Sequence, residues 1–181
     1  SQTPDDFCFA VKANRYITHM KNLIDPQEPV QQLLDAIKLL KQKVGPILFQ
    51  LPPQWSRNEQ RLASFLQILP PKFAYAFEFR NLSWYTEEIV ALLKDHQVAL
   101  CIHDKSGKFI KKTLTADFVY LRLHGPNGKY QQLYDREQLK TIAEDVHKWR
   151  ESGISVYIYF NNDAEANALR NAQELIEMLK R

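Results

Sequence analysis

The chain has 181 residues, of which 45% are hydrophobic and 25% charged, a composition ordinary for one globular domain with a sizeable core. Its formal net charge of +3 is too small, and its lysines and arginines are too dispersed, to indicate a nucleic-acid-binding protein. No apolar run approaches the roughly 20 residues of a membrane span, and the first six residues show no signal-peptide pattern.

Six short apolar runs are predicted to be β-strands, and polar or charged residues follow each of them. The runs are 7–11, 47–49, 75–77, 98–102, 118–121 and 156–160. Strands that are apolar throughout are typical of parallel sheets covered on both faces. Polar groups that gather at the carboxyl ends of such strands mark the place where a (β/α) barrel or an open α/β sheet binds its ligand.

Five stretches with helical periodicity alternate with these strands. They are 30–44, 62–69, 89–93, 139–149 and 168–179. Asp135 with Gln138 three residues later predicts a capped helix start, and Gly153 suits the left-handed residue after a helix end. Residues 105–116 have little periodicity and are predicted to be a loop. The alternation predicts a mainly parallel α/β sheet with right-handed crossovers.

Two cysteines, Cys8 and Cys101, lie inside predicted strands. We expect both to be buried free thiols, as in a protein of the reducing cytoplasm, rather than a disulfide.

Several strings are more specific than the alternation, and together they resemble the DUF72 family, also called YecE-like proteins. The strings are FAVK (9–12) with ITH (17–19), VGPILFQLPP (44–53), FEFRNLSW (77–84), YLRLHG (120–125) and YIYFNND (157–163). The resemblance covers nearly the whole chain and implies a TIM-type (β/α) barrel whose activity is largely unassigned. The family's first two βα units have no counterpart here. We therefore expect a single domain over 1–181, an incomplete barrel of six parallel strands truncated at its N-terminus, and self-association through its open sheet edges.

Glu78 and Arg80 lie two residues apart at the end of one strand, so their side chains share a face and can form a charge-assisted pair. One interpretation is a salt bridge at the barrel mouth that orders the loop to Trp84. The other is a general base or substrate clamp whose pKa the pair controls. The sequence favours neither interpretation over the other.

Arg122 and His124 have the same spacing, and Gly125 lets the backbone approach a ligand. Arginine suits a carboxylate or phosphate, and neutral histidine suits proton transfer. We favour a functional role here over a hydrogen-bonded core histidine.

Lys12 ends the first strand and is expected to pair with Glu78, which we favour over Schiff-base chemistry. His19 either contacts a ligand or makes a loop hydrogen bond before the first helix. Asp104 could join Glu78 and His124 in a divalent metal site, but no ligand spacing supports one. We therefore predict no cofactor, with a divalent metal as the less favoured alternative.

The remaining candidates for ligand binding are loop and strand-end residues: Gln50, Trp84, Tyr130, Asn161 and Asn162. Asn161 and Asn162, together with Asp163, are expected first to cap the last helix, with a phosphate site as the alternative. Trp84, Tyr130 and the nearby Tyr134 could stack on a sugar or base, or equally cover the barrel mouth.

Two functions stay open. The first is an enzyme that applies acid/base chemistry from Glu78 and His124 to a small polar, anionic or sugar-like molecule. In it Arg80, Arg122 and Lys12 stabilise charge. The alternative is a non-catalytic binding protein for a phosphate-bearing ligand, with nucleic acid less favoured but not excluded. The known nucleotide-loop, nucleophile-elbow and C-x-x-C motifs are absent from the sequence.

Overall fold

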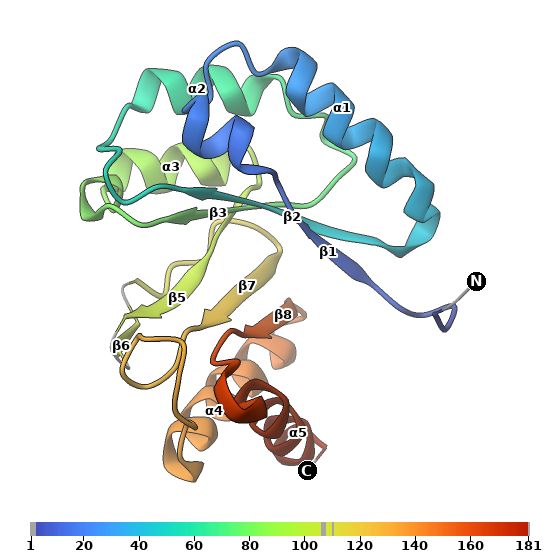
Figure 1. The fold of residues 1–181 in the computed structure, drawn as a ribbon, viewed down its shortest axis with the longest axis vertical. Coiled ribbons are helices and arrows are strands. Elements are labelled where there is room, and N and C mark those ends of the chain that lie inside the picture. The colour runs from blue at the N-terminus through green and yellow to red at the C-terminus, as the bar shows by residue number, and fades with distance from the viewer. Residues whose placement is uncertain (1–2, 106–107, 110, 181) are drawn as a thin grey trace. The chain divides into compact units, whose positions relative to one another are not determined.

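The computed structural model describes residues 3–105, 108–109 and 111–180 (Figure 1). The chain divides into two compact units, Ser1–Leu100 and Cys101–Arg181. Each unit has its own sheet and its own cluster of buried apolar side chains. No helix in the described part of the chain is long and apolar enough to cross a membrane.

Unit 1 is built on a parallel sheet with the strand order β1-β2-β3-β4. Its strands are β1 (Phe9–Lys12), β2 (Val44–Leu51), β3 (Tyr75–Phe79) and β4 (Ala99–Leu100). Its helices are η1 (Tyr16–Met20), α1 (Gln27–Ile37), η2 (Lys38–Lys43), α2 (Glu59–Gln67), η3 (Leu82–Trp84) and α3 (Glu87–Asp95). Helices α1, α2 and α3 lie on the same side of this sheet (Figure 1).

The core of unit 1 is rich in aromatic rings. Phe49 and Phe77 stack with their ring centroids 5.3 Å apart, and Phe65 of α2 packs edge-on against Phe49 at 5.0 Å. Successive side chains of a strand point to opposite faces of the sheet. The residues that directly follow Phe49 and Phe77 in the sequence therefore lie on the face opposite these rings. That face carries Gln50 of β2 and Glu78 of β3, which are register partners.

Unit 2 has the strand order β6-β5-β7-β8, in which β5, β7 and β8 are parallel and β6 pairs antiparallel with β5. Its strands are β5 (Ile102–Lys105), β6 (Lys108–Phe109), β7 (Phe118–Leu123) and β8 (Ser155–Phe160). Its helices are α4 (Arg136–Glu151), η4 (Ala164–Ala166) and α5 (Asn167–Leu179).

The two faces of the unit 2 sheet differ in character. Val119, Leu121 and Leu123 belong to a largely aliphatic core with α4 and α5. The alternate residues carry rings: Tyr120 stacks on Tyr159 at 4.9 Å between centroids. Strand alternation places Arg122 on the same face as Tyr120.

The alternating pattern predicted from the sequence is confirmed, with four local differences. The predicted strand 98–102 is divided at Cys101 into β4 and β5. The first long helix ends at Ile37, and the chain continues as the 3₁₀ segment η2. The loop 105–116 contains the short strand β6. Cys8 is exposed and precedes β1, so its predicted burial is wrong, although both cysteines are free thiols.

The predicted helix boundaries at Asp135 and Gly153 are confirmed. Asp135 and Gln138 form both halves of a capping box. Gly153 has φ +75°, the left-handed conformation that a helix end favours in glycine.

Candidate functional site

At the strand ends of unit 1, Glu78 is fully buried and its Oε1 lies 2.5 Å from Nε of Arg80. The prediction that these two side chains form a charge-assisted pair is confirmed. A buried carboxylate without such a partner would strongly destabilise the fold, so we expect the ion pair to stabilise unit 1 whether or not Glu78 also acts on a ligand. Gln50, its half-buried neighbour on β2, lies beside Glu78 in the ladder.

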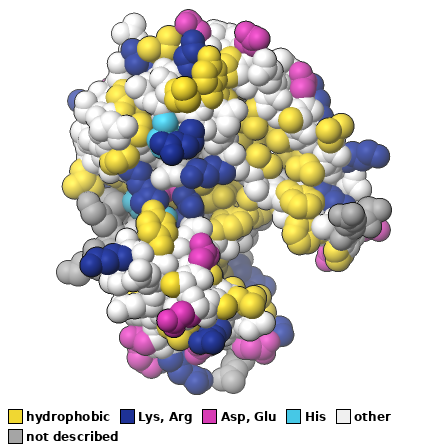
Figure 2. All heavy atoms as spheres, viewed as in Figure 1, with side chains coloured by type: hydrophobic (Ala, Val, Ile, Leu, Met, Phe, Trp, Pro, Cys, Tyr) yellow, Lys and Arg dark blue, Asp and Glu magenta, His cyan; other side chains and the backbone are white. Residues whose placement is uncertain are grey.

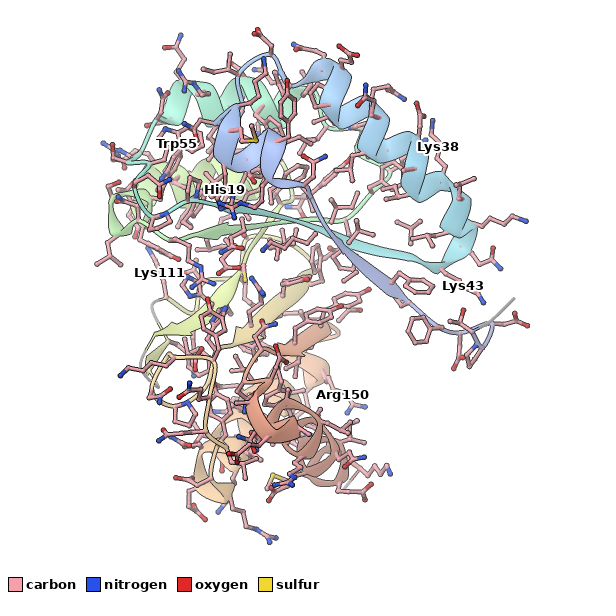
Figure 3. All side chains as sticks on the ribbon, in the orientation of Figure 1. His19, Lys38, Lys43, Trp55, Lys111 and Arg150 are labelled. Atoms are coloured by element: carbon pink, nitrogen blue, oxygen red, sulfur yellow. The ribbon has the colours of Figure 1, made fainter. Side chains whose placement is uncertain are left out.

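Lys12 ends β1, and His19 lies in the next element of the chain, the short helix η1 (Figure 3). The Nδ1 atom of His19 is 2.8 Å from Oγ1 of Thr18, which is the loop hydrogen bond that the sequence offered as one of two roles. Partial burial, followed by the charges of Arg15 and Lys12, lowers the pKa of His19. The pairing of Lys12 with Glu78 stays a prediction.

Trp84 is a core residue of unit 1. Its side chain is fully buried, it stacks on Phe79 at 4.9 Å between centroids, and its Nε1 donates to the carbonyl of Trp55 at 2.8 Å. A ring enclosed in this way presents no face to a ligand. Of the two interpretations of Trp84, the structure therefore favours packing over substrate contact.

In unit 2, His124 follows the last residue of β7 and is surrounded by ring and carboxyl groups. The ring centroid of His103 lies 5.8 Å from its own, and that of Tyr130 lies 5.1 Å away. Its Nδ1 is 3.4 Å from Oδ1 of Asp104. Two histidines, an exposed tyrosine and a carboxylate therefore meet at the end of β7.

Asp104 is a buried hydrogen-bond acceptor for two different groups. Its Oδ1 accepts the backbone N–H of His124 at 2.7 Å, and its Oδ2 accepts the hydroxyl of Tyr134. Burial, and then the bond to Asp104, raise the pKa of Tyr134, so this hydroxyl stays a proton donor. Both carboxylate oxygens are used inside the protein, which makes Asp104 a support for His124.

The less favoured alternative, a divalent metal site built from Asp104, Glu78 and His124, has no candidate ligand set in the part of the chain that is described. Within residues 3–105, 108–109 and 111–180, no three His, Cys, Asp or Glu side chains lie close enough together to hold a metal ion.

Arg122 is fixed by the strand next to it. Its Nε donates to Oδ1 of Asn161 at 3.0 Å, and the backbone N–H of Asn161 donates to the carbonyl of Leu123 at 2.7 Å. Asn161 thus extends the ladder between β7 and β8 and orients the half-buried guanidinium of Arg122.

The prediction that Asn161 and Asn162 cap the last helix is wrong. Helix α5 starts after Ala166, a residue with φ +59° and no side-chain cap. Asn162 is buried and its Nδ2 donates to the carbonyl of Gln132 at 2.8 Å and to Oδ1 of Asn171 at 2.9 Å. The segment η4 separates these asparagines from the helix start. The side-chain amide of Asn162 binds the loop before α4, and that of Asn161 binds Arg122.

Two residues of this cluster, His103 and Asn171, are not among the site residues predicted from the sequence, and Tyr134 is predicted only as a ring that stacks on a ligand or covers the barrel mouth. Asn171 did leave a signal, because it lies on the same helical stripe as Ala168, Ala172 and Leu175, where an apolar residue is expected. His103 and Tyr134 carry no such local mark, since only the fold brings them to the end of β7.

Parallel strands joined by helices, with polar side chains at the carboxyl ends of the strands, define an α/β protein of the TIM-type fold. The chain belongs to the DUF72 family, a family of proteins of unknown function whose model matches residues 1–181. The resemblance inferred from the sequence strings is confirmed.

Known relatives agree with this assignment. A crystal structure of a DUF72 family protein from Thermotoga maritima MSB8 is 29% identical, has a TM-score of 0.90, and is matched over 99% of this chain and 76% of that one. A DUF72 structure from Enterococcus faecalis V583, 20% identical, has a TM-score of 0.80 over 99% of this chain and 80% of its own. The UPF0759 protein YunF of Bacillus subtilis (strain 168) is 24% identical over 98% of this chain and 75% of its own length.

Proposed function

We propose that this protein is a cytoplasmic enzyme that applies acid/base chemistry to a small polar, anionic or sugar-like substrate, with His124 as the proton-transferring residue. The observation that carries the proposal is the arrangement around His124: a buried carboxylate beside Nδ1, and an exposed tyrosine ring against the imidazole.

An aspartate that orients a histidine is the arrangement by which many enzymes hold an imidazole for proton transfer. Asp104 takes this supporting role here, since it binds the backbone of His124 and lies beside its ring. Arg122, two residues earlier on β7, offers a planar cation for a carboxylate or phosphate. Tyr130, which is 45% exposed, offers a ring on which a sugar can stack.

In unit 1, Glu78 is the second candidate for acid/base chemistry, and Arg80, Lys12 and Gln50 are candidates for charge stabilisation and ligand contact. Support for them comes from the buried ion pair and from the adjacent positions of Gln50 and Glu78 in the ladder. His19, Asn161 and Asn162 stay candidates for ligand contact in the same proposal, with their observed hydrogen bonds as competing roles.

The alternative is a non-catalytic protein that binds a phosphate-bearing ligand, including nucleic acid. On the face that Figure 2 shows, acidic and basic side chains are interspersed over α4 and α5. This mixture of charges does not favour a nucleic-acid-binding surface on these two helices. Salt separates the two possibilities. Nucleic-acid binding should weaken by roughly 10³-fold or more between 50 and 200 mM salt, whereas a pocket for a small anion should lose less than about tenfold.

The test is calorimetric titration with inorganic phosphate, acetate and a sugar phosphate, followed by turnover assays on any ligand that binds. Arg122→Gln should weaken anion binding by about tenfold, and Arg170→Gln, an exposed arginine on α5, is the matched control. His124→Gln should lower turnover by about 10²-fold or more, and His147→Gln on α4 should not. Binding that survives Arg122→Gln unchanged would remove the anion site from the proposal.

A further inference from the structure

The hydroxyl of Tyr134 joins two parts of unit 2 that are distant in the sequence. It donates to Oδ2 of Asp104, at the end of β5, and accepts the backbone N–H of Gly125 at 2.6 Å. Asp104 in turn holds the backbone N–H of His124. The buried hydroxyl of Tyr134 therefore bonds two groups next to His124. One is the carboxylate of Asp104, which lies beside the imidazole, and the other is the backbone N–H of Gly125, the residue after His124.

Tyr134 is itself held through its backbone by Asn171 of α5. The Oδ1 of Asn171 accepts the N–H of Tyr134 at 3.0 Å, and its Nδ2 donates to the carbonyl of Tyr134 at 3.0 Å. Both asparagine and tyrosine are buried, so these bonds are sheltered from water. The backbone of Tyr134 is thus held by a residue of α5 that lies 37 positions further along the chain.

The loop between Gly125 and Tyr134 needs such bonds because its backbone is strained. Tyr130 has φ +60° and Gln132 has φ +59°, values that cost free energy in residues with a side chain. Asn162 binds the carbonyl of Gln132, and the N–H of Tyr130 donates to the carbonyl of His124 at 2.8 Å. These bonds keep Tyr130 against the imidazole.

We propose that Tyr134 and Asn171 are positioning residues for His124. Tyr134 fixes Asp104 and the peptide after His124, and Asn171 fixes Tyr134. The inference deepens the proposed function, on which it rests, because it names the residues that would hold the proton-transferring imidazole and the stacking ring of Tyr130 in place.

The test replaces Tyr134 by phenylalanine, which keeps the ring and removes only the hydroxyl. Tyr75→Phe is the matched control, because Tyr75 is also buried and donates its hydroxyl to a protein carbonyl, that of Pro70 at 3.0 Å, in unit 1. The chain has five histidines, and His124→Gln assigns the ring signals of His124 in ¹⁵N-histidine-labelled protein.

In Tyr134→Phe we expect the ring signals of His124 to move by more than their linewidth, and the amide proton of Gly125 to exchange about tenfold faster. Tyr75→Phe should change neither. Asn171→Asp keeps the acceptor for the N–H of Tyr134 and loses the donor to its carbonyl, so it should move the same signals in the same direction by less. It also serves as the test if Tyr134→Phe does not fold.

Signals of His124 and Gly125 that stay at their wild-type values in Tyr134→Phe, or that move equally in Tyr75→Phe, would overturn the positioning role. These readouts need no ligand. If they respond as expected while no anion or sugar phosphate binds, the positioning role stands and the proposed function fails.

Discussion

The two units stabilise the polar groups at their strand ends in different ways. In unit 1, the buried charge of Glu78 is balanced by Arg80, two residues along the same chain segment. In unit 2, Asp104 is bonded to His124 and to Tyr134, which follow it by 20 and 30 residues. The ion pair of unit 1 therefore forms between near neighbours in the sequence. The cluster around His124 forms only when several elements of unit 2 have packed together.

Their aromatic residues also differ in use. Unit 1 places Trp84 and the rings of Phe49, Phe77 and Phe79 in its core. Unit 2 has a core that is mostly aliphatic and leaves Tyr130 45% exposed beside His124. These four rings of unit 1 therefore contribute to its core, whereas the ring of Tyr130 in unit 2 is exposed beside His124.

Among the substitutions that probe this difference between the units, Trp84→Ala should cost the most stability. Truncating a fully buried tryptophan should destabilise the protein by about 3–5 kcal/mol, measured by urea unfolding. Tyr130→Ala should cost less than about 1 kcal/mol, because an exposed side chain leaves no cavity. Similar losses for the two variants would show that Tyr130 is structural and would remove it from the candidate site.

A somewhat smaller loss is expected for Arg80→Gln, which leaves the buried carboxylate of Glu78 without this cation. The free energy of unfolding should fall by about 3 kcal/mol. Arg57→Gln is the control in the same unit, because Arg57 pairs with Glu88 at 3.3 Å on the surface and an exposed pair contributes less than about 1 kcal/mol. If Arg80→Gln folds with wild-type stability but loses ligand binding, the clamp interpretation replaces the structural one.

The smallest expected effect is the contribution of His19, in unit 1, to the pH dependence of the free energy of unfolding. Burial and the charges of Arg15 and Lys12 lower the pKa of His19 in the folded protein below its usual value of about 6.5. As the pH falls, His19 is therefore protonated in the unfolded chain before it is protonated in the folded protein. The contribution of neutral His19 is present above about pH 6.5 and is lost as the pH falls below it.

Urea unfolding at a series of pH values checks this contribution. His19→Gln should fall less steeply in stability from pH 7 to pH 5 than the wild type, and Arg15→Gln should lie between the two. A wild-type slope in His19→Gln would mean that the acid sensitivity comes from other groups.

Features that depend on neighbours along the chain can be predicted from the amino-acid sequence alone. The apolar runs gave the strands, the spacing of Asp135 and Gln138 gave the start of α4, and the two-residue spacing of Glu78 and Arg80 gave their ion pair. Such features follow from strand alternation, helix periodicity and capping, which act over a few residues.

Tertiary packing, by contrast, sets which polar residues meet. It buried Trp84, separated Asn162 from the start of α5, and joined Asp104, Tyr134 and Asn171 around His124. These outcomes depend on which buried donor lies next to which acceptor after packing. The need to satisfy every buried polar group acts in three dimensions, so a residue such as Asn171 shows in the sequence only as a polar side chain on an apolar stripe.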